Sequence, residues 1–226
     1  MKKVLLTVGF VAFAAGATAG NFDGMYAGVK LDHAWSSVEY TDKTPAINGD
    51  FKTKDTKPKG LEVDLMFGQG FQNGDTVYGF EGHIGRGLSD TKKTWDKFDA
   101  ANAYDLSIKT RRLWKFGAAG RYGKVFNNAL VYGRLGLHAN QYESTLSVAA
   151  TGGGATVSSK KDSFYSFAIA PGFGVEVSVA PGVNARAEYV YEHSLTQHDI
   201  SNAAGGKVDV NEPRTHILSV GVSFAL

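Results

Sequence analysis

The chain has 226 residues, with 24 Lys and Arg against 22 Asp and Glu, a formal net charge of +2, and no cysteine. Disulfide bonds and a lipid anchor on cysteine are therefore excluded, and the near balance of charge leaves no basic surface of the kind that binds nucleic acid. No segment after the N-terminal apolar run is a continuous apolar stretch of the ~20 residues that a transmembrane helix needs.

The N-terminus has the pattern of a secretory signal peptide. It starts with Met-Lys-Lys, continues with an apolar run from Val4 to Ala15, and reaches a small-residue site at Ala17-Thr18-Ala19. This order of basic, apolar and small residues is typical of a cleaved export signal. The apolar run is too short to cross a membrane as a helix. We therefore predict a signal peptide over residues 1–19 and one domain over residues 20–226.

After this segment, apolar and polar side chains alternate with a period of two in eight places, as they do in strands. In chain order, these segments cover about residues 25–35, 61–71, 76–87, 108–124, 130–142, 164–179, 183–191 and 213–226. Short turns near Asn73, Asn127 and Pro181 join three pairs of them. Long polar segments, predicted to be loops, provide the other four connections at residues 36–59, 88–104, 143–162 and 192–212. Short turns at one end and long loops at the other are typical of outer-membrane barrels.

The hairpin from Gly172 to Tyr189 indicates which way the sheet faces. One face of each arm is apolar, and the opposite face carries only Gly, Ser, Asn and ions, among them Glu176 and Arg186. Unpaired charges are costly in a dry core, whereas a closed barrel that turns its apolar face to lipid accepts this pattern. A three-residue turn or a bulge beside Pro181-Gly182 would pair Glu176 with Arg186. The sequence thus predicts an all-β fold, an eight-stranded antiparallel up-and-down transmembrane β-barrel.

The same alternation predicts which charged side chains lie inside the barrel. They are Lys30, Asp32, Glu62, Asp64, Glu81, Arg121, Arg134, Glu176, Arg186 and Glu188. An eight-stranded barrel is just wide enough for side chains to fill its interior, and both signs of charge are present. The pattern therefore favours a lumen plugged by ion pairs over a catalytic site built on paired carboxylates. A narrow pore is a further alternative.

No cofactor or metal site is predicted, because the six histidines show no spacing typical of metal ligands. The segment from His198 to Ser201 resembles the His-x-Ser-Asn motif of outer-membrane lipid A deacylases. In such an enzyme Ser201 would be the nucleophile, His198 the base, and Asp199 or Glu192 the orienting carboxylate. The spacing is one residue too long, so on a strand His198 and Ser201 would face opposite ways. We predict no enzymatic activity and keep lipid modification as the alternative.

Six stretches of the sequence together resemble a known family. They are residues 25–31 (MYAGVKL), 78–81 (YGFE), 132–136 (YGRLG), 174–176 (GVE), 185–189 (ARAEY) and 218–224 (LSVGVSF). In this order and spacing they are similar to the eight-stranded transmembrane domain of OmpA and to related small outer-membrane barrels, which include porin-like surface antigens and adhesins. The resemblance covers essentially the whole chain after the signal peptide. It implies a non-enzymatic protein of the outer membrane whose four loops are exposed at the cell surface.

The resemblance also implies functional residues and partners. In OmpA-like barrels an interior set of two carboxylates, a lysine and an arginine closes the lumen; Glu81, Glu176 and Arg186 match three of these positions, and Arg121 takes that of the lysine. The implied C-terminal assembly signal consists of Val220, Val222, Phe224 and Leu226, where the family has a final Phe. The implied partners are lipopolysaccharide and other outer-membrane lipid, the barrel-assembly machinery, and a host or surface ligand of the loops.

Overall fold

The computed structural model describes residues 22–42, 54–56, 59–95, 104–150, 156–196, 198–201 and 207–226. The predicted signal peptide, residues 1–19, lies outside the described part of the chain. Within that part, no helix is long and apolar enough to span a membrane.

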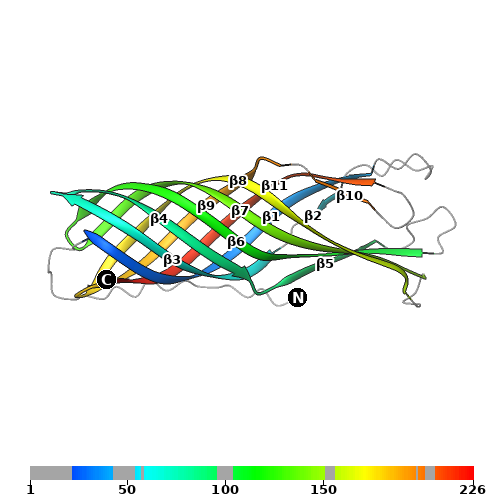
Figure 1. Ribbon diagram of the computed structural model, residues 1–226, viewed down its shortest axis with the longest axis horizontal. Helices are drawn as coiled ribbons and strands as arrows, with labels where there is room; N and C mark the ends of the chain where they lie inside the picture. The colour runs from blue at the N-terminus through cyan, green and yellow to red at the C-terminus, as the bar shows by residue number, and fades with distance from the viewer. Residues whose placement is uncertain are drawn as a thin grey trace, which may run out of the picture.

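Eight long antiparallel strands form a closed ring (Figure 1). They are β1 (Gly24–Asp42), β3 (Lys59–Asn73), β4 (Thr76–Gly87), β6 (Tyr104–Phe126), β7 (Ala129–Ala150), β8 (Thr156–Ala180), β9 (Val183–Ser194) and β11 (Lys207–Ala225). Each long strand pairs with the next one along the chain, and β11 pairs with β1 to close the ring. Three short strands are added at β2 (Lys54–Thr56), β5 (Asp90–Trp95) and β10 (His198–Ser201), which pair with β1, β6 and β11. The predicted eight-stranded antiparallel barrel is confirmed.

The outer surface of the barrel carries a belt of large, exposed apolar side chains from seven of the eight long strands; the outward side chains of β9 are only partly exposed. Leu65 is 59% exposed, Phe80 60%, Leu137 65% and Phe173 63%, although the backbones that carry them are fully paired with their neighbours. An apolar surface of this extent would be costly in water and is the surface that a transmembrane barrel turns to lipid.

Three short turns lie together at one end of the barrel, on the left in Figure 1. Gly74, Asn127 and Gly182 in these turns have φ angles of 62°, 57° and 70°. Glycine and asparagine accept this left-handed conformation, which tight hairpin turns require. The sequence therefore places permissive residues where the strands reverse.

The last of these turns decides the register of the β8–β9 hairpin. A shift in pairing between Ser178 and Ala180 shows a bulge just before the Pro181-Gly182 turn. Because of this bulge, Glu176 lies directly opposite Arg186, as the sequence predicted.

At the opposite end, which we call the extension end, the strands are longer than predicted (Figure 1). Residues 143–162, predicted to be a loop, are mostly strand, because β7 and β8 remain paired as far as Ala149 and Thr156. Strands also form inside the other three predicted loops, as β2, β5, β10 and the distal parts of β1, β6 and β11. Apolar residues alternate in these segments over only two or three positions, as Leu146 and Val148 do on β7, and the neighbouring residues are polar. The pattern by which strands are predicted is therefore too short here to stand out.

The strand extensions form two groups. Strands β5, β6, β7 and β8 remain paired in one group, and β10, β11, β1 and β2 in the other. Between the groups, β3 begins at Lys59, β4 ends at Gly87 and β9 ends at Ser194. The described part of the extension end thus consists of two four-stranded sheets that rise from one barrel.

Candidate functional site in the barrel lumen

Charged side chains fill the lumen. All ten residues predicted to face inward are buried, none more than 6% exposed. Arg112, Lys115 and Glu192 join them, at 7%, 2% and 2% exposure. We divide this network into a turn-side cluster and an extension-side cluster. The turn-side cluster consists of Lys30, Glu81, Arg121, Arg134, Glu176, Arg186 and Glu188, and the extension-side cluster of Asp32, Glu62, Asp64, Arg112, Lys115 and Glu192.

Arg186 lies at the centre of the turn-side cluster. Its guanidinium donates to Glu81 on β4 and to Glu176 on β8, the latter at 3.0 Å. Arg121 on β6 donates to the same Glu176 oxygen at 2.7 Å. The structure thus brings together the four residues that the sequence singled out, from four strands and across the width of the lumen.

Glu188 links the remaining cations of this cluster. The Nζ atom of Lys30 lies 3.0 Å from its carboxylate, and Nη1 of Arg134 lies 3.2 Å from it. The hydroxyl of Tyr132 donates to the other oxygen of Glu188 at 2.6 Å. Lys30 also lies 4.0 Å from Glu81, so a lysine belongs to the network in addition to Arg121.

Two tyrosines hold the arginines in place. The guanidinium of Arg121 lies 4.6 Å from the ring centroid of Tyr26, and that of Arg186 lies 5.4 Å from the same ring and 5.8 Å from Tyr132. Such cation–π contacts stabilise a desolvated cation. The hydroxyl of Tyr26 also donates to Glu81 at 2.9 Å. Each tyrosine thus contacts an arginine through its ring and donates a hydrogen bond to a carboxylate through its hydroxyl.

In the extension-side cluster, like charges face each other. Asp32 on β1 is paired directly with Glu62 on β3, an arrangement that is destabilising unless a cation lies nearby. Lys115 on β6 supplies that cation, with Nζ at 2.7 Å from Asp32, 3.2 Å from Glu62 and 2.8 Å from Asp64. Gly85 separates Lys115 from Asp64 in the pairing, and a Cβ there would lie 1.8 Å from the Asp64 carboxylate. The missing side chain at Gly85 lets the lysine reach across β4.

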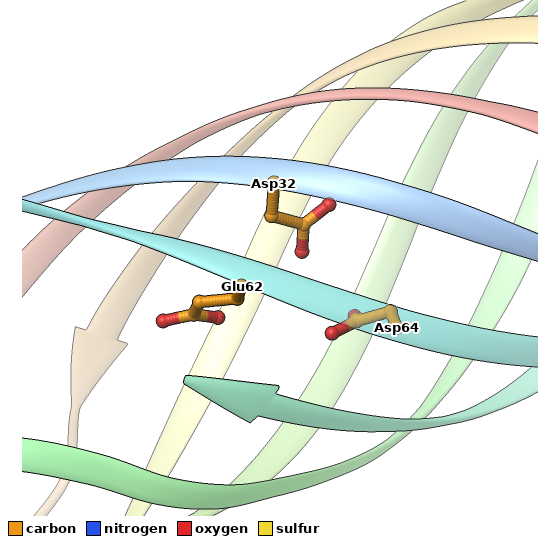
Figure 2. Close-up of side chains that lie close together, drawn as sticks. All are labelled: Asp32, Glu62 and Asp64. Atoms are coloured by element: carbon orange, nitrogen blue, oxygen red, sulfur yellow. The ribbon is translucent and has the colours of Figure 1, made fainter. Parts of the chain in front are cut away.

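The same three carboxylates have the geometry of a cation site. One oxygen from each of Asp32, Glu62 and Asp64 lies within 4.8 Å of the others, and Figure 2 shows the three side chains projecting from neighbouring strands β1 and β3. Carboxylate oxygens are the ligands that Ca²⁺ and Mg²⁺ prefer. The ammonium of Lys115 lies within ion-pair distance of all three carboxylates, so the protein provides its own cation at this position.

Arg112 closes the extension-side cluster. It donates to Glu62 at 3.1 Å, to Glu192 on β9 at 2.8 Å and to the Tyr142 hydroxyl at 2.9 Å. Glu192 also bonds Nδ1 of His138 on β7. These contacts join β3, β6, β7 and β9 in one layer across the lumen.

Sequence reasoning missed the three added residues for different reasons. A register shift between Arg112 and Trp114 inserts a bulge, which turns Arg112 inward against the simple alternation. Glu192 was assigned to a loop, although it continues the inward series of Arg186 and Glu188 along β9. Lys115 has the correct parity for an inward residue, and counting it among the interior charges would have found it.

Two other predicted sets lie outside the lumen network. The four residues of the predicted assembly signal face outward on β11 and at its end; Val220 is 43% exposed, Val222 36%, Phe224 48% and Leu226 74%. Their role in assembly stays a prediction. The backbone from His198 to Ser201 forms β10 rather than an irregular loop, and it pairs with β11. The side chains of the predicted catalytic pair lie outside the described part of the chain.

The lumen holds a network of closely paired opposite charges. Across the two clusters, six cations meet seven carboxylates, and every one of these charges lies within 4 Å of an opposite charge. Buried ion pairs of this kind rigidify a structure when their partners are present.

Comparisons with known proteins agree with this architecture. A family model described as an outer membrane protein beta-barrel domain matches residues 4–225. OprG from Pseudomonas aeruginosa is similar in structure, with a TM-score of 0.54 and 16% identity over 92% of this chain and 99% of that one. Neisserial surface protein A has a TM-score of 0.44 and 18% identity over 94% and 100% of the two chains. Ail, the attachment invasion locus protein of Yersinia pestis, has a TM-score of 0.41 and 17% identity over 89% and 99%. A comparison with curated protein sequences found no match.

Proposed function

We propose that this chain, which belongs to the family of outer-membrane protein β-barrel domains, is a non-enzymatic surface protein with a closed lumen. The barrel lies in the outer membrane. In this proposal, the strand extensions present the predicted loops to ligands outside the cell. The observation that carries the proposal is the buried ion-pair network that spans the lumen at two levels.

The network supports closure because a continuous water path would have to pass both clusters. On the turn side, Arg186 would have to leave Glu81 and Glu176; on the extension side, Arg112 would have to leave Glu192. Breaking a buried pair by removing one partner typically costs about 3–5 kcal/mol. Several such pairs hold each level, so spontaneous opening of the whole lumen would be rare.

The strand extensions support display at the surface. They rise from the end of the barrel opposite the short turns, and short turns face the periplasm in outer-membrane barrels. By this orientation, the two four-stranded sheets face outward. Binding residues are often found on loops that a rigid scaffold positions.

Conductance tests the closed lumen. The purified barrel, reconstituted into planar bilayers, should show no steady conductance steps. A variant with Arg186→Ala and Glu81→Ala removes a central pair, and we expect it to conduct more often than the unmodified barrel. Steady steps from the unmodified barrel would instead support the narrow-pore alternative.

Cysteine labelling tests the orientation, and the chain offers a clean background because it contains no cysteine. Ser159→Cys places a thiol at an exposed position on the extension of β8, and Asp75→Cys places one in an exposed short turn. In intact cells, a membrane-impermeant maleimide should label only Ser159→Cys. Labelling of Asp75→Cys alone would reverse the proposed orientation.

A further inference from the structure

A group of aromatic and basic side chains lies on the outer surface of the barrel, at the edge of the apolar belt that faces the extension end. We call it the rim patch. It consists of His33, Trp35, Tyr189, Tyr191, His193, Arg214 and His216, from β1, β9 and β11.

The rim patch is held together around His216. Its ring stacks on Trp35 with a centroid distance of 5.7 Å and an interplanar angle of 12°, and it lies 5.2 Å from the ring of Tyr191. The hydroxyl of Tyr189 and Nδ1 of His216 are 2.6 Å apart, a hydrogen bond that orients the imidazole. This bond uses Nδ1, so Nε2 is the ring nitrogen left for an external partner.

Charges are sorted between the two faces of these strands. Arg214 is exposed, and in the pairing of β11 with β9 it lies directly opposite His193. Within the described side chains of β1, β3, β9 and β11, every carboxylate faces the lumen and is buried; these are Asp32, Glu62, Asp64, Glu188 and Glu192. Among the side chains that the structure describes on these strands, the outer face at this level therefore presents basic groups without neighbouring acids.

The level of the patch along the barrel indicates its surroundings. Leu218 and Val220, the next outward residues of β11 towards the turn end, are 39% and 43% exposed and belong to the apolar belt. Aromatic rings with one polar end are enriched where acyl chains give way to headgroups. In the orientation proposed above, this is the outer leaflet, whose principal lipid is a phosphorylated glycolipid.

We propose that the rim patch binds the headgroup of this phosphorylated glycolipid, lipid A. The guanidinium of Arg214 and the imidazole of His216 bind a phosphate, for which arginine has the matching bidentate geometry. The exposed parts of the Trp35 and Tyr191 rings pack against the sugar. The proposal rests on the outward orientation of the extension end.

Binding in detergent micelles tests this site independently of orientation in the cell. The folded, purified barrel is titrated with bisphosphorylated lipid A and, separately, with the same lipid after removal of its phosphates. We expect the phosphorylated form to bind at least about tenfold more tightly, the contribution of one charged hydrogen bond or more. Arg214→Gln should weaken this binding by about tenfold, and adding His216→Gln should weaken it further.

Arg86→Gln is the matched control. Arg86 is also exposed beside a tryptophan, 5.0 Å from the ring of Trp114, but on the β4–β6 side of the barrel. Its substitution should leave binding unchanged, and all variants should keep the heat-dependent gel shift of a folded barrel. The proposal is overturned by equal binding of the dephosphorylated lipid or by unchanged affinity in Arg214→Gln. An equal loss in Arg86→Gln, or equal binding of phosphatidylglycerol, would show non-specific attraction and also overturn it. If only the cysteine-labelling test fails, the proposed orientation in the membrane is wrong, but the binding site measured in micelles stands.

Discussion

Arg186 and Glu176 face each other across the β8–β9 hairpin, and the guanidinium Nη2 lies 3.0 Å from the carboxylate. The same arginine reaches Glu81 on β4, so a local cross-strand pair also joins distant strands of the barrel. The side chain of Arg186 thus takes part both in a pair within the β8–β9 hairpin and in a contact across the lumen to β4.

A double-mutant cycle should reveal this coupling. Arg186→Ala leaves Glu81 and Glu176 without their shared partner and should lower the free energy of unfolding by about 3–5 kcal/mol. Combining it with Glu176→Ala should cost less than the sum of the single changes, by about 0.5–3 kcal/mol. Urea unfolding of the folded barrel in detergent measures all three values.

The exposed pair of Lys109 and Asp90 serves as the control. Its charged atoms lie 2.6 Å apart, but the two side chains are 48% and 40% exposed. Its coupling energy should lie between about 0 and 1 kcal/mol, as for other surface pairs. Equal coupling in both cycles, or strict additivity for Arg186 and Glu176, would contradict the central role of Arg186.

Removing the internal cation should create a requirement for an external one. Lys115→Met leaves Asp32, Glu62 and Asp64 without the ammonium between them, and should destabilise the barrel by about 3–5 kcal/mol. Millimolar Ca²⁺ should restore part of this loss by binding the freed oxygens. Urea unfolding in Ca²⁺ and in chelator provides the measurement.

Arg134→Met is the control for this effect. It removes a buried cation from the turn-side cluster, away from the three carboxylates. It should destabilise the barrel without any recovery in Ca²⁺. Recovery of both variants would indicate a general effect of the ion, and recovery of neither would show that the three carboxylates cannot hold a metal.

Glycines on the inner and outer faces of the barrel wall should respond differently to substitution by alanine. A Cβ at Gly68 would lie 2.4 Å from the Tyr26 ring and 2.8 Å from a backbone oxygen, whereas one at Gly120 would meet nothing within 4 Å. Gly68→Ala should therefore cost about 1–3 kcal/mol, the usual range for overpacking. Gly120→Ala should be near neutral. A similar unfolding midpoint for both variants would show that the lumen is not tightly packed around Tyr26.

The lipid-modifying alternative makes a separate prediction. The purified barrel incubated with lipid A should release no fatty acid, as followed by mass spectrometry. A nucleophile and its base must meet at about 2.6–3.2 Å, and the spacing of His198 and Ser201 disfavours this on one strand. Release that disappears in Ser201→Ala would identify an enzyme and refute the non-enzymatic proposal.

The sequence was most informative where one face of a strand meets lipid. There, alternation identified the eight strands and the inward direction of residues such as Glu81 and Arg134. It failed above the apolar belt, because apolar residues alternate there over only two or three positions, too few to distinguish a strand from a loop, while the backbone pairing continues. Residues 143–162 were therefore predicted to be a loop, although most of them belong to β7 and β8.

The composition of the site was partly predictable and its connections were not. Parity places Lys115 inside, but its three partners depend on the register of β1, β3 and β6 and on the missing side chain at Gly85. Arg112 escapes parity altogether, because the bulge before Trp114 reverses its direction. A single extra residue in a strand changes the face of every side chain beyond it.

The division of the extension end into two sheets has a consequence for contacts between neighbouring molecules. Inside the membrane the ring has no free strand edge. In the described part of the chain, each four-stranded sheet above the ring has two edge strands, β2 and β10 in one sheet and β5 and β8 in the other. Such edges can recruit further strands and lead to aggregation, and proteins protect them with short strands and lysines. β2, β5 and β10 have only 3, 6 and 4 residues, and the long β8 carries Lys160 and Lys161 on its extension. Crowded copies of this protein can thus lie side by side without joining their sheets.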